Sequence, residues 1–275
     1  MRRPLESMHL TFGAMLLSIV ACTSDAAHGQ APPYLAPDAI DLTYVLPPPP
    51  TSAVALGRDL AAVRAAQVTR TAEQLERAQD DAEVSAFRFA DVLGADFAAD
   101  SVPITTGFLR KANRDLGAYI TRAKDCWRRP RPFEVDDTIQ PLADLLASAG
   151  ARPNEPPPAA APLSVDSPCS TAVVASRYSY SYPSGHSTFG AMTAILLAEM
   201  VPEKREQLYE RGWEYGDMRI IGGVHFPSDV EAGRILASMV VALMMQNDRF
   251  QTDLAAARAE LRGVLGLEDG AELPH

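Results

Sequence analysis

The chain has 275 residues, of which 47% are apolar and 22% charged, a composition typical of a folded globular protein rather than a disordered one. Acidic residues outnumber basic ones by 35 to 25, which gives a formal net charge of −10 at pH 7. This balance argues against a nucleic-acid polymer as partner, because such partners select a basic surface. Any anion site must therefore rest on a local cluster of positive charge.

The first 21 residues are predicted to be an export signal. Arg2 and Arg3 precede the apolar run LTFGAMLLSIVA, whose length suits a signal peptide. The run leads into the letters IVAC, which resemble a bacterial lipoprotein cleavage box with Cys22 as the lipidated residue; ordinary cleavage a few residues later is the alternative. We therefore expect a periplasmic or secreted protein, and an outer-membrane lipid anchor through Cys22 stays open.

No later window reaches the roughly 18 consecutive apolar residues of a membrane span, so no transmembrane span is predicted. Export leaves Cys126 and Cys169 in the body of the chain. An oxidising compartment favours a disulfide between them, and two unpaired buried thiols are the alternative.

The rest of the chain divides into a lead and one domain. Residues 22–52 are rich in proline and are expected to run extended over the surface. Residues 53–275 are predicted to form a single all-α domain, because apolar side chains recur three and four positions apart and alternating strand patterns are nearly absent. Helical patterns cover residues 52–67, 71–93, 106–124, about 140–148, 186–200, 203–217, 228–247 and about 250–264.

The first segment with chemical potential follows the pattern at 106–124. Four cations fall within eight residues there: Lys124, Arg128, Arg129 and Arg131. Guanidinium groups match phosphate oxygens in pairs, and a lysine adds a point charge. Prolines in the run RRPRPF end the helix. A solvated basic patch or a proline-rich docking stretch is the alternative interpretation.

The second segment is YPSGHST, residues 182–188. Ser184 is a good N-cap, which places Gly185 and His186 in the first turn of an apolar helix. Backbone N–H groups are unpaired there and the helix dipole is positive, so the turn can bind an anion. An ordinary loop-to-helix junction with a surface histidine is the alternative.

The third segment is RIIGGVHFPSD, residues 219–229. Two glycines break the preceding helix, and Pro227 suits the first turn of the next one. His225 then lies just before that helix, with Asp229 in its first turn. The spacing lets the Asp229 carboxylate hydrogen-bond one ring nitrogen of His225 and leave the other free. A capping aspartate beside a structural histidine is the alternative.

The three segments together resemble the three-part signature of the type 2 phosphatidic acid phosphatase superfamily. The pattern is Lys124-x6-Arg131-Pro, then Pro-Ser-Gly-His186, then Arg219-x5-His225-x3-Asp229. Within the superfamily the chain is most similar to the bacterial class A non-specific acid phosphatases, from about residue 70 through residue 238. The resemblance implies a single helical bundle of the phosphatidic acid phosphatase and haloperoxidase kind.

The resemblance also implies the chemistry. An acid phosphatase of this family hydrolyses phosphate monoesters of broad range through a phosphohistidine, with possible phosphotransfer to alcohols, and it uses no metal or other cofactor. His225 is then the nucleophile, His186 the general acid and Asp229 the residue that orients His225. The phosphate-binding residues are Lys124, Arg131, Ser184, Gly185 and Arg219. A homo-oligomer, such as a dimer, is also implied.

One position departs from the family pattern. Met218 stands where the family usually has a serine before Arg219, which removes a possible hydroxyl donor to the phosphate.

Three other functions are alternatives. A lipid-phosphate phosphatase is disfavoured by the missing membrane spans, and the vanadium-dependent haloperoxidases that share this anion site are much longer chains. A non-catalytic phosphate-binding lipoprotein would need only the cations, without two histidines and an aspartate.

Overall fold

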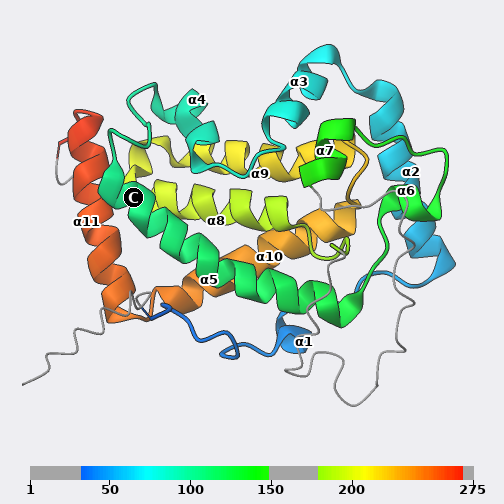
Figure 1. Ribbon diagram of the computed structural model, residues 1–275, viewed down its shortest axis with the longest axis horizontal. Coiled ribbons are helices and arrows are strands. Elements are labelled where there is room, and N and C mark those ends of the chain that lie inside the picture. Colours follow the sequence, from blue (N-terminus) through cyan, green and yellow to red (C-terminus); the bar gives the residue numbers. More distant parts are fainter. Residues whose placement is uncertain (1–31, 149–178, 269–275) are drawn as a thin grey trace, which may run out of the picture. The chain divides into compact units, whose positions relative to one another are not determined.

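The computed structural model describes residues 32–148 and 179–268, and all regular structure in these residues is helical, as predicted. Figure 1 shows the arrangement. The elements are α1 (Leu42–Val45), α2 (Ala53–Thr69), α3 (Ala72–Asp80), η1 (Ala86–Phe89), α4 (Ala90–Leu93), α5 (Pro103–Trp127), α6 (Pro132–Val135), α7 (Ala143–Ser148), α8 (Gly185–Met200), η2 (Pro202–Lys204), α9 (Arg205–Ile221), α10 (Pro227–Met244) and α11 (Asp248–Val264).

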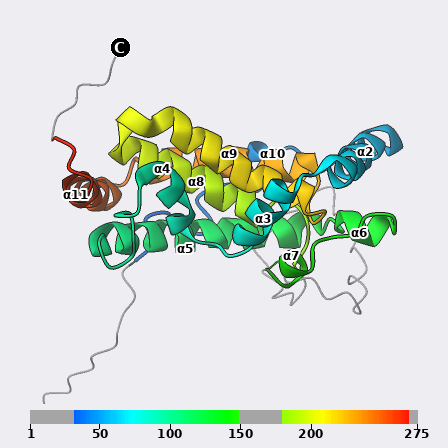
Figure 2. The same ribbon diagram turned by 90° about the horizontal axis from the view of Figure 1, so that it is seen from above.

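Helix α8 lies at the centre of the described bundle. Its sequence is apolar or small on every side, which is the composition of a helix that is buried all round. It packs against α9, α10, α5 and α11, as Figures 1 and 2 show from two directions. The N-terminal turn of α8, which carries the predicted anion site, is therefore surrounded by helices.

Glycines set how closely α8 approaches its two main neighbours. A Cβ on Gly190 would lie 2.8 Å from the Cβ of Tyr215 in α9, and one on Gly233 in α10 would lie 2.8 Å from the carbonyl oxygen of Ser184. Real side chains do not tolerate such distances, so both contacts require glycine. This close packing brings the start of α8 next to the start of α10.

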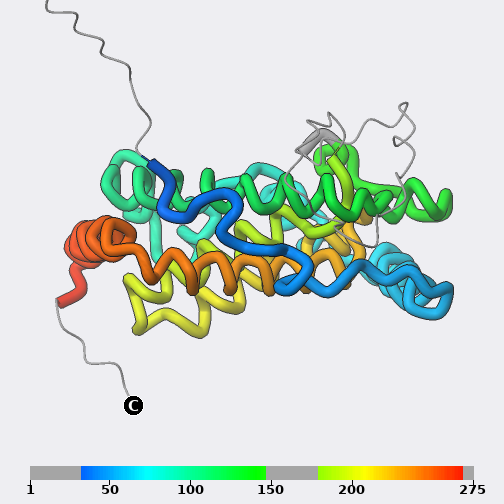
Figure 3. Tube along the Cα trace, turned by 90° about the horizontal axis from the view of Figure 1, so that it is seen from below, coloured from blue at the N-terminus to red at the C-terminus, as the bar shows by residue number. Residues whose placement is uncertain are grey.

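The N-terminal lead differs from the prediction. Residues 42–45 form the short helix α1, and Tyr34, Leu42 and Leu46 are buried rather than on the surface. The Tyr34 ring packs edge-on against Phe250 of α11, with the ring centroids 5.0 Å apart. Figure 3 shows this segment crossing the face made by α5 and α10. Prolines explain why α1 is the only helix before α2 in the described part of the lead, whereas the apolar side chains between the prolines pack into the core.

The helix predicted over residues 71–93 is also interrupted. Helix α3 ends at Asp80, residues 81–85 are not helical, and η1 and α4 follow. The side chain of Asp81 is fully buried and pairs with Arg211 of α9. A buried ion pair with a distant helix overrides the local helical pattern, because an unpaired carboxylate could not stay in the interior.

The structure also bears on the predicted disulfide and on the prediction that no helix spans a membrane. Cys126 is disulfide-bonded, while its predicted partner Cys169 and the predicted lipidation site Cys22 lie outside the described residues. Within residues 32–148 and 179–268, no helix is long and apolar enough to cross a membrane.

Candidate active site

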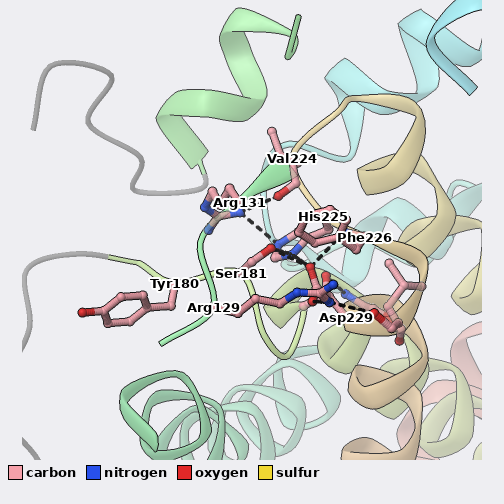
Figure 4. Close-up of polar contacts among 12 residues, drawn as sticks. Arg129, Arg131, Tyr180, Ser181, Val224, His225, Phe226 and Asp229 are labelled. Carbon is pink, nitrogen blue, oxygen red and sulfur yellow. Dashed lines mark hydrogen bonds and ion pairs between the residues drawn. The ribbon is translucent and has the colours of Figure 1, made fainter. Parts of the chain in front are cut away.

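The three predicted segments meet around His225. The chain that follows α5 brings Arg129 and Arg131, the stretch before α8 brings Ser181, and the connection between α9 and α10 brings His225 itself. Figure 4 shows Arg131 and Asp229 on opposite sides of the histidine ring, while the side chain of Tyr180 points away from it.

Asp229 holds one side of the His225 ring. Its Oδ2 accepts hydrogen bonds from the backbone N–H of Phe226 at 2.9 Å and from the hydroxyl of Ser181 at 2.5 Å, and lies 3.4 Å from Nδ1 of His225. The carboxylate is fully buried in the first turn of α10, where the helix dipole favours a negative charge. The predicted pairing of His225 and Asp229 is present, and Ser181 is an unforeseen third member.

Arg131 holds the other side of the ring. Its Nη1 lies 3.2 Å from Nε2 of His225 and donates to the carbonyl oxygen of Val224 at 2.8 Å. A guanidinium has no acceptor, so Nε2 must be the unprotonated nitrogen, with its lone pair exposed to the donor. Burial and the nearby cations Arg131 and Lys124 hold the pKa of His225 well below its usual range. The ring is thus neutral, with the proton on Nδ1 beside Asp229.

Three cations lie close enough to His225 to act on it electrostatically: Arg131, Lys124 and Arg219. Burial and the charge of Arg131 hold the pKa of Lys124 well below its usual range, and the Lys124 ammonium donates to the carbonyl oxygen of Tyr180. Burial also lowers the pKa of Arg131 to about 10 and, together with the repulsion of Arg131, that of Arg219 to about 9. Because burial and the charge of Arg131 both disfavour the charged forms of Lys124 and Arg219, the site favours a bound anion that neutralises them.

The start of α8 has the predicted geometry. Ser184 is the N-cap, and its hydroxyl oxygen accepts from the backbone N–H of Ser187 at 3.3 Å. Gly185 is the first helical residue, and a Cβ there would meet only a methyl group of Ile120 at 3.7 Å. Apart from this contact, a side chain at position 185 would point into open space, so an anion can approach the backbone of this first helical turn closely, where the helix dipole is positive.

His186 is buried one residue further along α8. Its Nε2 lies 3.1 Å from the carbonyl oxygen of Ala82, and its ring lies nearly parallel to that of Tyr215. A carbonyl only accepts, so Nε2 carries the proton of the neutral ring and a second proton can enter only at Nδ1. Burial and the charge of Arg219 lower the pKa of His186 to about 3. The ring is neutral until a negative ligand favours its protonated form.

Sequence reasoning assigned Arg129 to a phosphate-binding run, and the structure gives it another task. Its Nη1 donates to Oδ1 of Asp229 at 2.6 Å, and its Nη2 donates to Oδ2 of Asp59 at 2.7 Å. All three side chains are buried. Asp59 comes from α2, 70 residues earlier in the chain, and no local pattern pointed to it. Of the four cations in the run, Lys124 and Arg131 face His225, while Arg128 caps the end of α5.

Met218 lies in an apolar setting beside the site. It is buried and packs in a cluster with Ala78, Leu145 and Val224, which brings together α3, α7 and the chain just before His225. The Met218 side chain in this position stabilises the α9–α10 connection by apolar packing rather than by binding a ligand. Among the described residues, no group of three histidine, cysteine, aspartate or glutamate side chains is arranged to hold a metal ion.

Comparison with known proteins shows which family the whole sequence resembles. The sequence model of the PAP2 superfamily matches residues 112–253. The chain is 29% identical to the non-specific acid phosphatase of Salmonella typhimurium, over 98% of this chain and 99% of that protein. It is 30% identical to the non-specific acid phosphatase of Salmonella typhi over 98% of each chain, and 31% identical to that of Providencia stuartii over 81% of each.

Proposed function

This chain belongs to the PAP2 superfamily and is an acid phosphatase, and we propose that it hydrolyses phosphate monoesters through a phosphohistidine formed on His225. The observation that carries the proposal is the state of that ring. Its Nε2 is unprotonated and lies beside the Arg131 guanidinium, Asp229 lies at Nδ1, and the charges of Lys124, Arg131 and Arg219 all act on the ring. A nucleophile beside a phosphate-binding cluster is the arrangement that phosphoryl transfer requires.

In the first step, Nε2 of His225 attacks phosphorus and forms the N–P bond while the ester P–O bond breaks. Lys124, Arg131 and Arg219, with the backbone N–H groups at the start of α8, neutralise the equatorial oxygens, where the transition state carries its charge. Asp229 stabilises the positive charge that develops on the ring, because its Oδ2 faces the Nδ1 proton.

His186 supplies the proton for the leaving oxygen. The bound phosphate raises its pKa above the value of about 3 found in the free site, so that Nδ1 takes up a proton while Nε2 stays bonded to Ala82. Transfer of the Nδ1 proton to the departing oxygen returns the ring to its neutral form. In the second step, neutral His186 accepts a proton from water, which attacks phosphorus and breaks the N–P bond.

We propose a broad range of monoester substrates, because the cations and the α8 turn bind the phosphoryl group and place few demands on the organic part. An alcohol that replaces water in the second step receives the phosphoryl group, which makes phosphotransfer a companion reaction. The two opposite protonation demands predict a bell-shaped rate profile with its maximum on the acid side of neutrality.

We propose that the protein is exported, on the basis of Arg2, Arg3 and the apolar run that follows them. N-terminal sequencing of the processed protein tests this. A free terminus a few residues after Cys22 indicates ordinary cleavage, a blocked terminus at Cys22 indicates lipidation, and an intact Met1 contradicts export.

The direct test of function is hydrolysis of p-nitrophenyl phosphate by the purified protein after dialysis against EDTA. We expect full activity, because side-chain cations alone bind the phosphate, and competitive inhibition by orthovanadate, which can become five-coordinate on His225. Activity that is lost with EDTA and restored by zinc or magnesium contradicts the mechanism. The His225→Ala protein controls for contaminating phosphatases.

A further inference from the structure

We propose that the non-helical segment of residues 81–85, the 81–85 loop, is held by Arg211 and Tyr215 of α9 so that it positions His186 for proton transfer. Arg211 and Tyr215 are in this account positioning residues that act through the backbone of the loop. The inference rests on the proposed role of His186 as general acid, and it assigns a task to a part of the chain that precedes the matched residues 112–253.

The first anchor lies at the start of the loop. Arg211 donates from Nη1 to Oδ2 of Asp81 at 2.9 Å and from Nη2 to Oδ1 at 2.5 Å, a two-point contact that fixes both groups in one plane. Asp81 is 0% exposed and Arg211 is 4% exposed. Arg211 also donates from Nε to Asp91 of α4 at 3.0 Å, so one guanidinium holds the chain on both sides of the loop.

The second anchor lies at the middle and end of the loop. The hydroxyl of Tyr215 donates to the carbonyl oxygen of Glu83 at 2.7 Å and accepts from the backbone N–H of Ser85 at 3.4 Å. Arg211 and Tyr215 lie one turn apart on α9, so both anchors come from the same helix face. The loop is thereby held at three of its five residues.

Ala82 lies between the two anchors, and its carbonyl oxygen accepts from Nε2 of His186 at 3.1 Å. The Tyr215 ring that supports the loop also lies against the imidazole, with the ring centroids 6.1 Å apart and the planes 20° from parallel. The same tyrosine thus restrains the face of the histidine ring and the hydrogen-bond partner of one nitrogen. The position and tautomer of His186 follow from where this loop is held.

Because the helix is interrupted here, the Ala82 carbonyl oxygen can accept the hydrogen bond from His186. If the helical pattern of residues 71–93 continued unbroken, the Ala82 carbonyl would accept the backbone N–H four residues later and could not serve His186. The buried pair of Arg211 and Asp81 is by itself weak evidence for added stability, because two charges must lose their water. A positioning role accounts for both the break and the ion pair.

The consequence concerns the proton. With Nε2–H donated to Ala82, the only transferable proton is on Nδ1, and the ring returns to the same tautomer after each turnover. A loosened loop lets neutral His186 take the other tautomer or turn, which slows proton donation and leaves the nucleophile untouched. The loss of rate caused by a loosened loop must therefore grow with the basicity of the leaving oxygen.

The test compares two esters in the variants Tyr215→Phe and Asp81→Asn. The quantity is the ratio of kcat for glycerol phosphate, which releases a strongly basic alkoxide, to kcat for p-nitrophenyl phosphate, whose phenolate leaves unprotonated. We expect Tyr215→Phe to lower this ratio about three- to tenfold, the equivalent of one hydrogen bond. Asp81→Asn should lower it further, and the control Tyr209→Phe, on the same helix, should leave it unchanged.

His186→Ala separates failure of this inference from failure of the proposed function. If His186→Ala lowers the ratio while Tyr215→Phe leaves it unchanged or slows both esters equally, the positioning role is wrong and the general acid stands. If His186→Ala itself leaves the ratio unchanged, the general acid is wrong, and the inference with it. Adding Tyr215→Phe to His186→Ala should lower the ratio no further, whereas a merely structural defect would. Tyr215→Phe removes only a hydroxyl, so it keeps the test decisive if Asp81→Asn does not fold.

Discussion

His225 and His186 are both buried and both held in the neutral form, yet they are held by different kinds of contact. His225 lies between two charged side chains, with Asp229 at Nδ1 and Arg131 at Nε2. His186 is held at Nε2 by an uncharged backbone carbonyl, that of Ala82. All side chains that hold His225 come from the matched PAP2 residues 112–253, whereas Ala82 precedes them.

The difference matches what each ring must do. A nucleophile needs a fixed lone pair and a nearby negative charge for the cation it becomes, and a carboxylate supplies this throughout the reaction. An acid must gain and lose a proton in every turnover, and a carboxylate partner would hold that proton too firmly. A carbonyl fixes the tautomer of His186 without adding charge, so the bound phosphate itself decides when the ring is protonated.

The largest expected effect is that of removing the nucleophile. His225→Ala should lower kcat by more than about 10⁴-fold for every monoester, because no phosphohistidine can form without the ring nitrogen. Steady-state assays with an alkyl and an aryl phosphate measure this. Residual activity confined to p-nitrophenyl phosphate would show that another group can attack and that His225 is not the nucleophile.

Removal of the acid should act selectively. His186→Ala should lose most of the roughly 10²–10⁴-fold that general acid catalysis supplies when the substrate is glycerol phosphate, and far less with p-nitrophenyl phosphate. The ratio of the two rates is the measurement. Equal slowing of both esters would make His186 a phosphate ligand, and the contrast between the two histidines would disappear.

The free energy of unfolding should depend on the buried ion pairs that Arg129 makes with Asp59 and Asp229. Arg129→Met leaves Asp59 and Asp229 buried without their cation and should lower the free energy of unfolding by about 3–5 kcal/mol. Arg64→Met is the matched control: the Arg64 side chain is 50% exposed and pairs with Asp136, so its loss should cost about 0–1 kcal/mol. Urea denaturation measures both.

Adding Asp59→Asn to Arg129→Met should recover part of the loss, because it removes one of the two uncompensated charges. A double variant that is less stable than Arg129→Met alone would contradict the assignment of Arg129 as the shared partner of both carboxylates.

The last expected effect is gradual, a pH dependence of the free energy of unfolding. The pKa of His186 is about 3 in the folded protein and about 6.5 in an unfolded chain, so between these values the unfolded state binds a proton that the folded state does not. Stability therefore falls as pH falls through this window, by up to about 1.4 kcal/mol per pH unit for this histidine. His186→Gln should remove that part of the slope in urea denaturation.

Saturating phosphate sharpens the same prediction. The bound anion raises the pKa of His186, so it should weaken the dependence of the free energy of unfolding on pH in the wild-type protein. The same dependence in His186→Gln should be less affected. A wild-type stability that stays constant from pH 6.5 to pH 4 would contradict the neutral, buried state of His186.

Local patterns in the sequence predicted the parts of the site that depend on local geometry. Ser184 as N-cap, the glycine break after Ile221, and Pro227 at the start of α10 all lie where expected, because capping and proline preferences act within one turn. These signals sufficed to place His186, His225 and Asp229 correctly in their elements.

Contacts between distant segments could not be predicted in this way. Arg129 and Asp59 are 70 residues apart, and Arg211 and Asp81 are 130 apart. Arg129 lay in a run of cations that was interpreted as phosphate-binding, and the helical pattern of 71–93 gave no sign that Asp81 leaves the helix to reach α9. The burial of Tyr34 was missed for the same reason, since its partners lie on α5 and α11.

The central claim is tested most directly by trapping the phosphoenzyme. The protein is mixed with p-nitrophenyl phosphate at acid pH, denatured within the first turnovers, and mapped by peptide mass spectrometry under alkaline conditions that preserve phosphohistidine. The account predicts a single phosphoryl group on His225, more of it in His186→Ala if hydrolysis of the intermediate slows, and none in His225→Ala. A phosphoryl group on His186 or on a serine, or release of phosphate without any adduct, would contradict it.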